Sequence, residues 1–88
     1  MTAYVKPISV EASANGSGNA TTVSSARTVR AVNPGSTGVL VTVTDSAGVT
    51  VGTLTLAGQE SVLIPKKSTD KVFAGSATVL FAAVTSPR

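Results

Sequence analysis

The sequence contains no cysteine, no histidine and no tryptophan. Without cysteine the chain has no disulfide, no thiolate nucleophile and no cysteine-based zinc or iron–sulfur site. Without histidine it lacks the usual general base at neutral pH and the commonest metal ligand. These absences exclude many catalytic chemistries, and we expect no enzyme, no cofactor and no metal. The length of 88 residues predicts a single domain, residues 1–88.

Segments that would direct the chain to a membrane or out of the cell are also missing. The first ten residues, MTAYVKPISV, carry one charge and a proline but no apolar core, so no secretory signal is predicted. No apolar run approaches the ~20 residues of a membrane-spanning helix. Because a secreted domain of this size normally needs disulfides or a metal, their absence points to a reducing compartment or to support from an assembly.

Charged residues are scarce as well, at 12% of the chain, which is about half the usual share. The net charge of +3 therefore reflects few acids rather than many bases. Lys66, Lys67 and Lys71 form the one basic cluster, and Arg27 and Arg30 form a looser pair.

What the chain does have is a hydrophobic period of two, which is typical of strands with one buried face. Residues 38–45 alternate in this way and predict a strand. Asp45-Ser46-Ala47-Gly48 then suits a type I turn whose glycine takes a positive φ, and residues 49–56 complete a hairpin. The apolar parity changes at Gly52, which indicates either a β-bulge or a strand that passes between sheets.

The remaining segments extend the all-strand pattern. Further strands are predicted at 3–10, where Pro7 restricts the segment to an edge, at 22–33, at 60–64 and at 77–85. Residues 66–75 could form one turn of helix. Because turns recur every 8–12 residues or so, we predict an all-β fold, a six- to seven-stranded antiparallel β-sandwich of immunoglobulin-like or jelly-roll-like type.

Glu11–Thr21 is rich in glycine, serine and asparagine and predicts a flexible loop, so residues 1–21 would be an N-terminal strand followed by that loop. Gly16-Ser17-Gly18 resembles part of a phosphate-binding loop, but it lacks the third glycine and the following helix. A linker is the better interpretation. Two Asn-x-Ser/Thr triplets in the segment are attributed to its composition, because no secretory signal accompanies them.

Catalytic constellations are not found. A Ser–Lys pair such as Lys67-Ser68 would need a desolvated lysine, whereas this pair lies in a polar loop. The four acids, Glu11, Asp45, Glu60 and Asp70, are scattered among loops and strand ends, while glycosidases and calcium sites need converging carboxylates.

The basic residues could bind either a nucleic acid or another protein. Lysines on one loop could contact phosphates, but single-strand binding also needs aromatic stacking platforms, and the chain has only two phenylalanines and one tyrosine. We therefore expect protein contacts. Arg27 and Arg30 have opposite parity, so at most one of them faces a given partner. The candidate partner-contact residues are Tyr4, Lys6, Arg27, Arg30, Lys66, Lys67 and Lys71.

The run Thr28–Lys67, TVRAVNPGSTGVLVTVTDSAGVTVGTLTLAGQESVLIPKK, resembles small virion proteins of tailed bacteriophages, especially those of marine bacteria and cyanobacteria. The similar features are the TVRAVN strand, the DSAG hairpin and the strand–turn–strand that follows it. The resemblance covers roughly half of the chain. It implies a multi-copy structural protein of the virion that decorates or cements the capsid by binding the major capsid protein or other virion proteins. We expect assembly in the host cytoplasm, no membrane contact and a homo-oligomer or a lattice of copies.

Two alternatives come from other functional classes. The chain could be a head–tail connector, tail or fibre component, which would be present at a unique vertex. It could instead be a small module that binds a glycan or a peptide, but the shortage of tryptophan and tyrosine argues against this.

Overall fold

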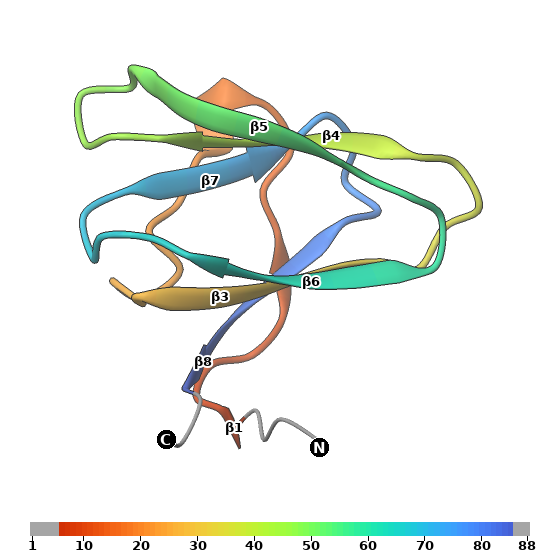
Figure 1. Cartoon of the computed structure of the whole chain (residues 1–88), viewed down its shortest axis with the longest axis horizontal. Coiled ribbons are helices and arrows are strands. Elements are labelled where there is room, and N and C mark those ends of the chain that lie inside the picture. The colour runs from red at the N-terminus through yellow and green to blue at the C-terminus, as the bar shows by residue number, and fades with distance from the viewer. Residues whose placement is uncertain (1–5, 86–88) are drawn as a thin grey trace.

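The computed structural model describes residues 6–85 of the chain and shows two β-sheets packed face to face (Figure 1). The elements are β1 (Lys6–Pro7), β2 (Ala12–Ser13), the 3₁₀ helix η1 (Ser17–Asn19), β3 (Thr28–Asn33), β4 (Val39–Thr44), β5 (Thr50–Leu56), β6 (Glu60–Pro65), β7 (Lys71–Ala74) and β8 (Leu80–Thr85). Within the described residues no helix is long and apolar enough to cross a membrane.

The strand order confirms the predicted antiparallel β-sandwich. One sheet has the order β1-β8-β3-β6, with β2 also paired to β8, and the other has the order β5-β4-β7. β1 pairs with the end of β8 (Lys6 opposite Thr85) and β2 with its start (Ser13 opposite Leu80), so the two short strands share one edge. The sheets therefore have four and three strand positions. The last strand, β8, joins β3 and β6, whereas in an immunoglobulin sandwich it would join the other sheet.

The β4–β5 hairpin forms as its sequence predicts. Gly48 has φ 90°, and the Asp45 carboxylate accepts hydrogen bonds from the backbone N–H groups of Ala47 and Val49, both at 2.9 Å. The register shifts where Val43 opposite Gly52 gives way to Thr44 opposite Thr50, leaving Val51 as the extra residue. The β-bulge beside Gly52 is thus confirmed, and β5 stays within one sheet.

The strand predicted at residues 22–33 begins later, at Thr28. Val23, Ser24 and Ser25 instead form a left-handed turn with φ of 53°, 59° and 57°. This conformation costs roughly 1–2 kcal/mol per residue for an L-amino acid. It is held by the burial of Val23 and Ala26, 8% and 7% exposed, so tertiary packing overrides the β-branched composition that predicted a strand.

Two further expectations need correction. Residues 66–75 contain the strand β7, not a turn of helix, because Val72 and Ala74 alternate into the core. Residues 11–21, expected as a flexible loop, include β2 and η1 and are bonded to β7: the N–H of Ala74 donates to the carbonyl of Ala14, 2.8 Å, and the N–H of Gly16 donates to that of Ala74, 2.9 Å. The predicted first strand at 3–10 lies partly outside the described residues, and β1 does occupy a sheet edge.

The space between the sheets is filled mostly by small side chains. The core combines alanines with valines and a few larger residues, and its largest fully buried side chains are Phe81, Leu56, Val29, Val41, Val72, Val79 and Asn33. Both faces of β8 are covered, since Phe81, Ala82, Ala83 and Val84 are all buried. This confirms the central strand predicted at residues 77–85, although the strand begins at Leu80.

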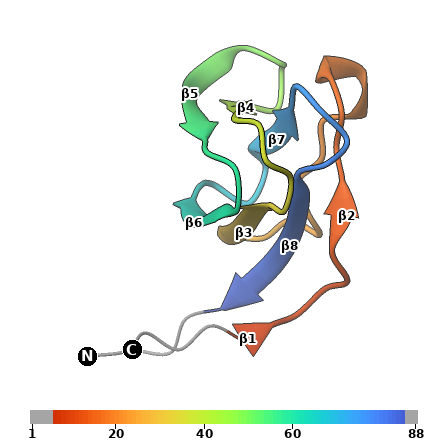
Figure 2. The same ribbon diagram turned by 90° about the vertical axis from the view of Figure 1, so that its right-hand side faces the viewer.

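The two long sides of the sandwich differ. On one side the N-terminal segment passes from the β8 edge to the β7 edge, where Asn15 and Thr21 form bridges to Ala74 and Val72. On the other side, at the left of Figure 2, lie β5 and β6. Within residues 6–85, β5 pairs only with β4 and β6 pairs only with β3, so both strands are sheet edges.

Candidate interaction surface

Four basic residues from distant parts of the sequence lie at one end of the sandwich, and we call this the basic end: Arg27, Lys66, Lys67 and Lys71. The strand register places them there, because Thr28 at the start of β3 lies opposite Pro65 at the end of β6. In the other sheet Lys71 lies opposite Thr44 at the end of β4. The loops that meet at this end are on the left of Figure 1.

A pair of contacts joins the two basic segments, although they are 40 residues apart in sequence. The backbone N–H of Lys66 donates to the carbonyl of Arg27 at 2.8 Å, and its ammonium donates to the carbonyl of Ala26 at 2.7 Å. Together with Pro65 and Ser68, these segments line a hollow of about 650 Å³. The arrangement brings three cations, Arg27, Lys66 and Lys67, around one concave surface.

Ser68 and Thr69 line the same hollow and were not among the predicted contact residues. They form the middle of a turn in which the N–H of Asp70 donates to the carbonyl of Lys67 at 3.0 Å. The one feature of the sequence that could have indicated Ser68 and Thr69 as contact residues is their position between Lys67 and Asp70. They add two hydroxyl groups to the cationic surface.

The carboxylates at the basic end are occupied by backbone groups. Asp70, 8% exposed, accepts a hydrogen bond from the N–H of Lys67 at 3.2 Å. Asp45 accepts the two hydrogen bonds of its own hairpin turn. Among the described residues the one ion pair within 4.0 Å is Arg30–Glu11, so Arg27 and Lys67 keep their charge available to a partner.

Lys66 has a mainly structural role at this end. Its ammonium also donates to the carbonyl of Lys67 at 3.2 Å, and its side chain is half-buried. Burial lowers the pKa of the Lys66 ammonium, and attraction to Asp70 partly offsets this. Lys66 therefore orders the loop that presents Arg27 and Lys67.

This lowered pKa predicts a pH dependence of stability. Above the folded-state pKa the native chain has released the Lys66 proton, while the unfolded chain retains it up to about pH 10.5. The unfolded state then binds more protons, so the free energy of unfolding should rise with pH in this window. Urea unfolding of the wild type and of Lys66→Met from about pH 8 to about pH 10.5 measures the effect. As the pH rises, the free energy of unfolding of the wild type should increase relative to that of Lys66→Met. A difference between the two proteins that does not change with pH would contradict the burial of Lys66.

Arg30, another predicted contact residue, does not join this surface. Arg30 lies on the outer face of the four-stranded sheet, where its guanidinium donates to the Glu11 carboxylate at 3.1 Å. Lys6 lies in β1, opposite Thr85. Tyr4 lies outside the described residues. Arg27 and Arg30 are thus presented on different surfaces, but Arg27 precedes β3, so strand parity is not the reason.

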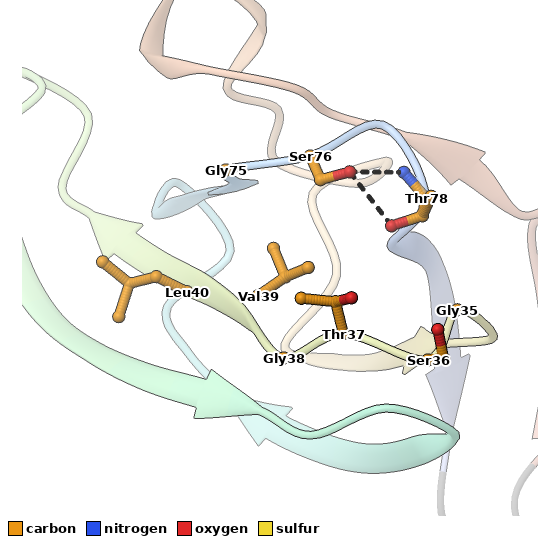
Figure 3. A pocket seen from close by; sticks show the side chains of 9 residues that line it. All are labelled: Gly35, Ser36, Thr37, Gly38, Val39, Leu40, Gly75, Ser76 and Thr78. Atoms are coloured by element: carbon orange, nitrogen blue, oxygen red, sulfur yellow. Dashed lines mark hydrogen bonds between the residues drawn. The ribbon is translucent and has the colours of Figure 1, made fainter.

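The opposite end of the sandwich has a different character. A hollow of about 580 Å³ at this end is lined by residues 35–40 and by Gly75, Ser76 and Thr78. Figure 3 shows the side chains of these residues. The hollow contains no charged side chain, and the Ser76 hydroxyl is engaged with the hydroxyl and N–H of Thr78 at 3.0 and 3.2 Å. The nearby loops, 57–60 included, carry one charged residue, Glu60. Within residues 6–85 the two ends of the sandwich therefore differ in charge.

Residues 6–85 contain no cluster of three or more acidic side chains that could hold a metal ion. No protein-family model, no curated protein and no solved structure matches the chain.

Proposed function

We propose that this chain is a non-catalytic structural protein of a tailed-bacteriophage virion, a decoration protein that binds the outer surface of the major capsid lattice. The observation that carries the proposal is the basic end, where Arg27, Lys66 and Lys67 converge around one hollow. A capsid surface that repeats exposed carboxylates would be complementary in charge to these cations. The resemblance of residues 28–67 to small virion proteins supports the same class of function.

The small size of the core also supports an assembly role. A chain of 88 residues buries only about 60–65% of the surface that its unfolded form exposes. Its core is made largely of alanine and valine, which contribute less burial energy than larger side chains. Binding to a lattice adds stability by mass action. Exposed apolar residues such as Ile8 and Val10, 57% and 89% exposed, supply further contact area outside the basic end.

The proposal predicts that the protein co-sediments with empty capsids of the phage that encodes it. Arg27→Gln combined with Lys67→Gln should weaken this binding about tenfold, because two exposed ion pairs contribute roughly 0.4–2 kcal/mol together. The control is Arg30→Gln, which removes a cation that is already paired with Glu11 and should change binding little. Higher ionic strength should weaken wild-type binding and leave the double variant less affected.

Failure of the wild type to co-sediment would overturn the proposal, as would equal binding by the double variant and the control. Quantitative mass spectrometry of intact virions adds a separate test. A copy number that matches the capsid lattice supports decoration, whereas a copy number confined to one vertex would assign the chain to a connector, tail or fibre and overturn it.

A further inference from the structure

The strand β5 forms a free edge of the three-stranded sheet, and this edge is a second surface, besides the basic end, that could bind a partner. Within residues 6–85, β5 pairs with β4 alone, and most of its residues are exposed. An edge strand of this kind presents a row of backbone N–H and C=O groups that another strand can pair with. The other edge of the same sheet, β7, is instead bridged by Asn15 and Thr21. Among the described residues, β5 is therefore the open edge of this sheet.

This edge lacks the usual protection against pairing. Residues 49–56 contain no charged residue and no proline, and Val49 and Val51 are 62% and 64% exposed. The bulge at Val51 distorts only the start of the strand, because Gly52 to Leu56 pair regularly with β4. The neighbouring edge strand β6 differs, since it begins with Glu60 and ends with Pro65. Such residues discourage strand addition.

We propose that β5 is the edge at which a second copy of this chain binds. The two β5 strands would pair antiparallel about a two-fold axis and join two three-stranded sheets into one six-stranded sheet. A strand paired antiparallel with itself is self-complementary, so one edge serves both copies.

Charge supports both the partner and the orientation. The start of β5 lies at the basic end, where Val51 and Gly52 share a hollow with both Lys66 and Asp70. Asp45 and Asp70 offset two of the four cations at this end, which leaves a net charge of +2 there. The end of β5 lies beside Glu60, whose carboxylate accepts a hydrogen bond from the N–H of Ala57 at 2.7 Å. Antiparallel pairing brings the basic end of one copy toward Glu60 of the other. Parallel pairing would bring the two basic ends together and is disfavoured.

The first test is sedimentation of the purified chain over a concentration series from about 10 µM to about 1 mM, the range of weak specific interfaces. The wild type should pass from monomer to dimer. Thr53→Lys places a charge on the exposed edge and should raise the dissociation constant at least about tenfold. Leu40→Lys is the matched control, because Leu40 is 51% exposed on the same outer face but lies in the central strand β4. It should leave the dimer intact.

The second test uses the absence of cysteine from the chain, which makes introduced cysteines unambiguous. In a two-fold pairing centred on Leu54, residue 53 of one copy lies opposite residue 55 of the other, with Cβ atoms about 5 Å apart. A mixture of Thr53→Cys and Thr55→Cys proteins should therefore form a mixed disulfide rapidly under mild oxidation. Leu40→Cys should not form a disulfide-linked dimer at a comparable rate.

A chain that remains monomeric at about 1 mM would overturn the proposal. A dimer that Thr53→Lys leaves unchanged would overturn it as well, as would cross-linking through Leu40→Cys as fast as through the mixture. The proposal does not rest on the virion function, because these measurements need only the purified chain. Capsid binding and dimerisation can therefore fail separately.

Discussion

Asn33→Ala is expected to lower the free energy of unfolding by about 3 kcal/mol, because it leaves buried backbone groups without partners. Asn33 is fully buried at the end of β3. Its amide N–H₂ donates to the carbonyls of Thr37, 2.8 Å, and Leu56, 3.1 Å, and its side-chain oxygen accepts from the N–H of Gly35, 3.1 Å. One side chain thus links β3, the β3–β4 connection and the end of β5 in the other sheet.

Urea unfolding measures this effect, and Asn19→Ala is the matched control. Asn19 is exposed, and its amide donates to the carbonyl of Asn15 within the same short segment, 2.8 Å. Its removal should cost less than about 1 kcal/mol, because water can replace the lost hydrogen bond. Asn33→Asp should be as harmful as Asn33→Ala, since it removes both donors and introduces a buried charge. Equal losses for Asn33→Ala and Asn19→Ala would contradict the bridging role.

Phe81→Ala is expected to destabilise the protein more, by about 3–5 kcal/mol. Phe81 is 1% exposed in the central strand β8, and in the ladder it lies opposite Ala31 of β3 and Ala12 of β2. Neighbours as small as alanine cannot move far enough to fill the cavity. A domain of this length has a total stability of roughly 4–13 kcal/mol, so the loss is a large share of it.

Thermal and urea unfolding monitored by circular dichroism provide the measurement. Phe73→Ala is the control, because Phe73 lies opposite Thr42 in the other sheet and is only half-buried where it packs against the core. Its truncation should cost about 1–2 kcal/mol. If the two variants were equally stable, Phe81 would not be the centre of the core.

Elements governed by local sequence could be predicted well. The β4–β5 hairpin follows from Asp45 and Gly48, whose side-chain hydrogen bonds and positive φ are properties of a four-residue turn. The alternation of β4 and the double-faced burial of β8 follow from periodicity and apolar content alone. The parity change at Gly52 located the bulge to within one residue.

Elements governed by distant contacts could not be predicted. The left-handed turn at Val23–Ser25 contains no glycine. The hydroxyls of Thr21 and Thr22 accept hydrogen bonds from the N–H groups of Val23 and Ser25, but threonine is equally typical of a strand and does not indicate positive φ. β7 has four residues and only two inward side chains, too few for a periodic signal. The basic end depends on the register between β3 and β6, which unites Arg27 with Lys66, and no single segment encodes that register. The contact of Asn33 with Leu56 could not be predicted either, because it depends on how the two sheets pack and not on the local sequence.

The position of β8 has a consequence for how the protein acquires its fold during translation. β8 inserts between β3 and the N-terminal strands, so each of its pairings joins residues far apart in the chain. Assembly dominated by such contacts is slow. While the ribosome is still adding residues before Leu80, one edge of β3 has no partner and Val29 lacks its neighbour Ala83. Until β8 has been synthesised, the nascent chain therefore exposes an unpaired strand edge and apolar side chains of β3. Chaperones would matter most during this interval.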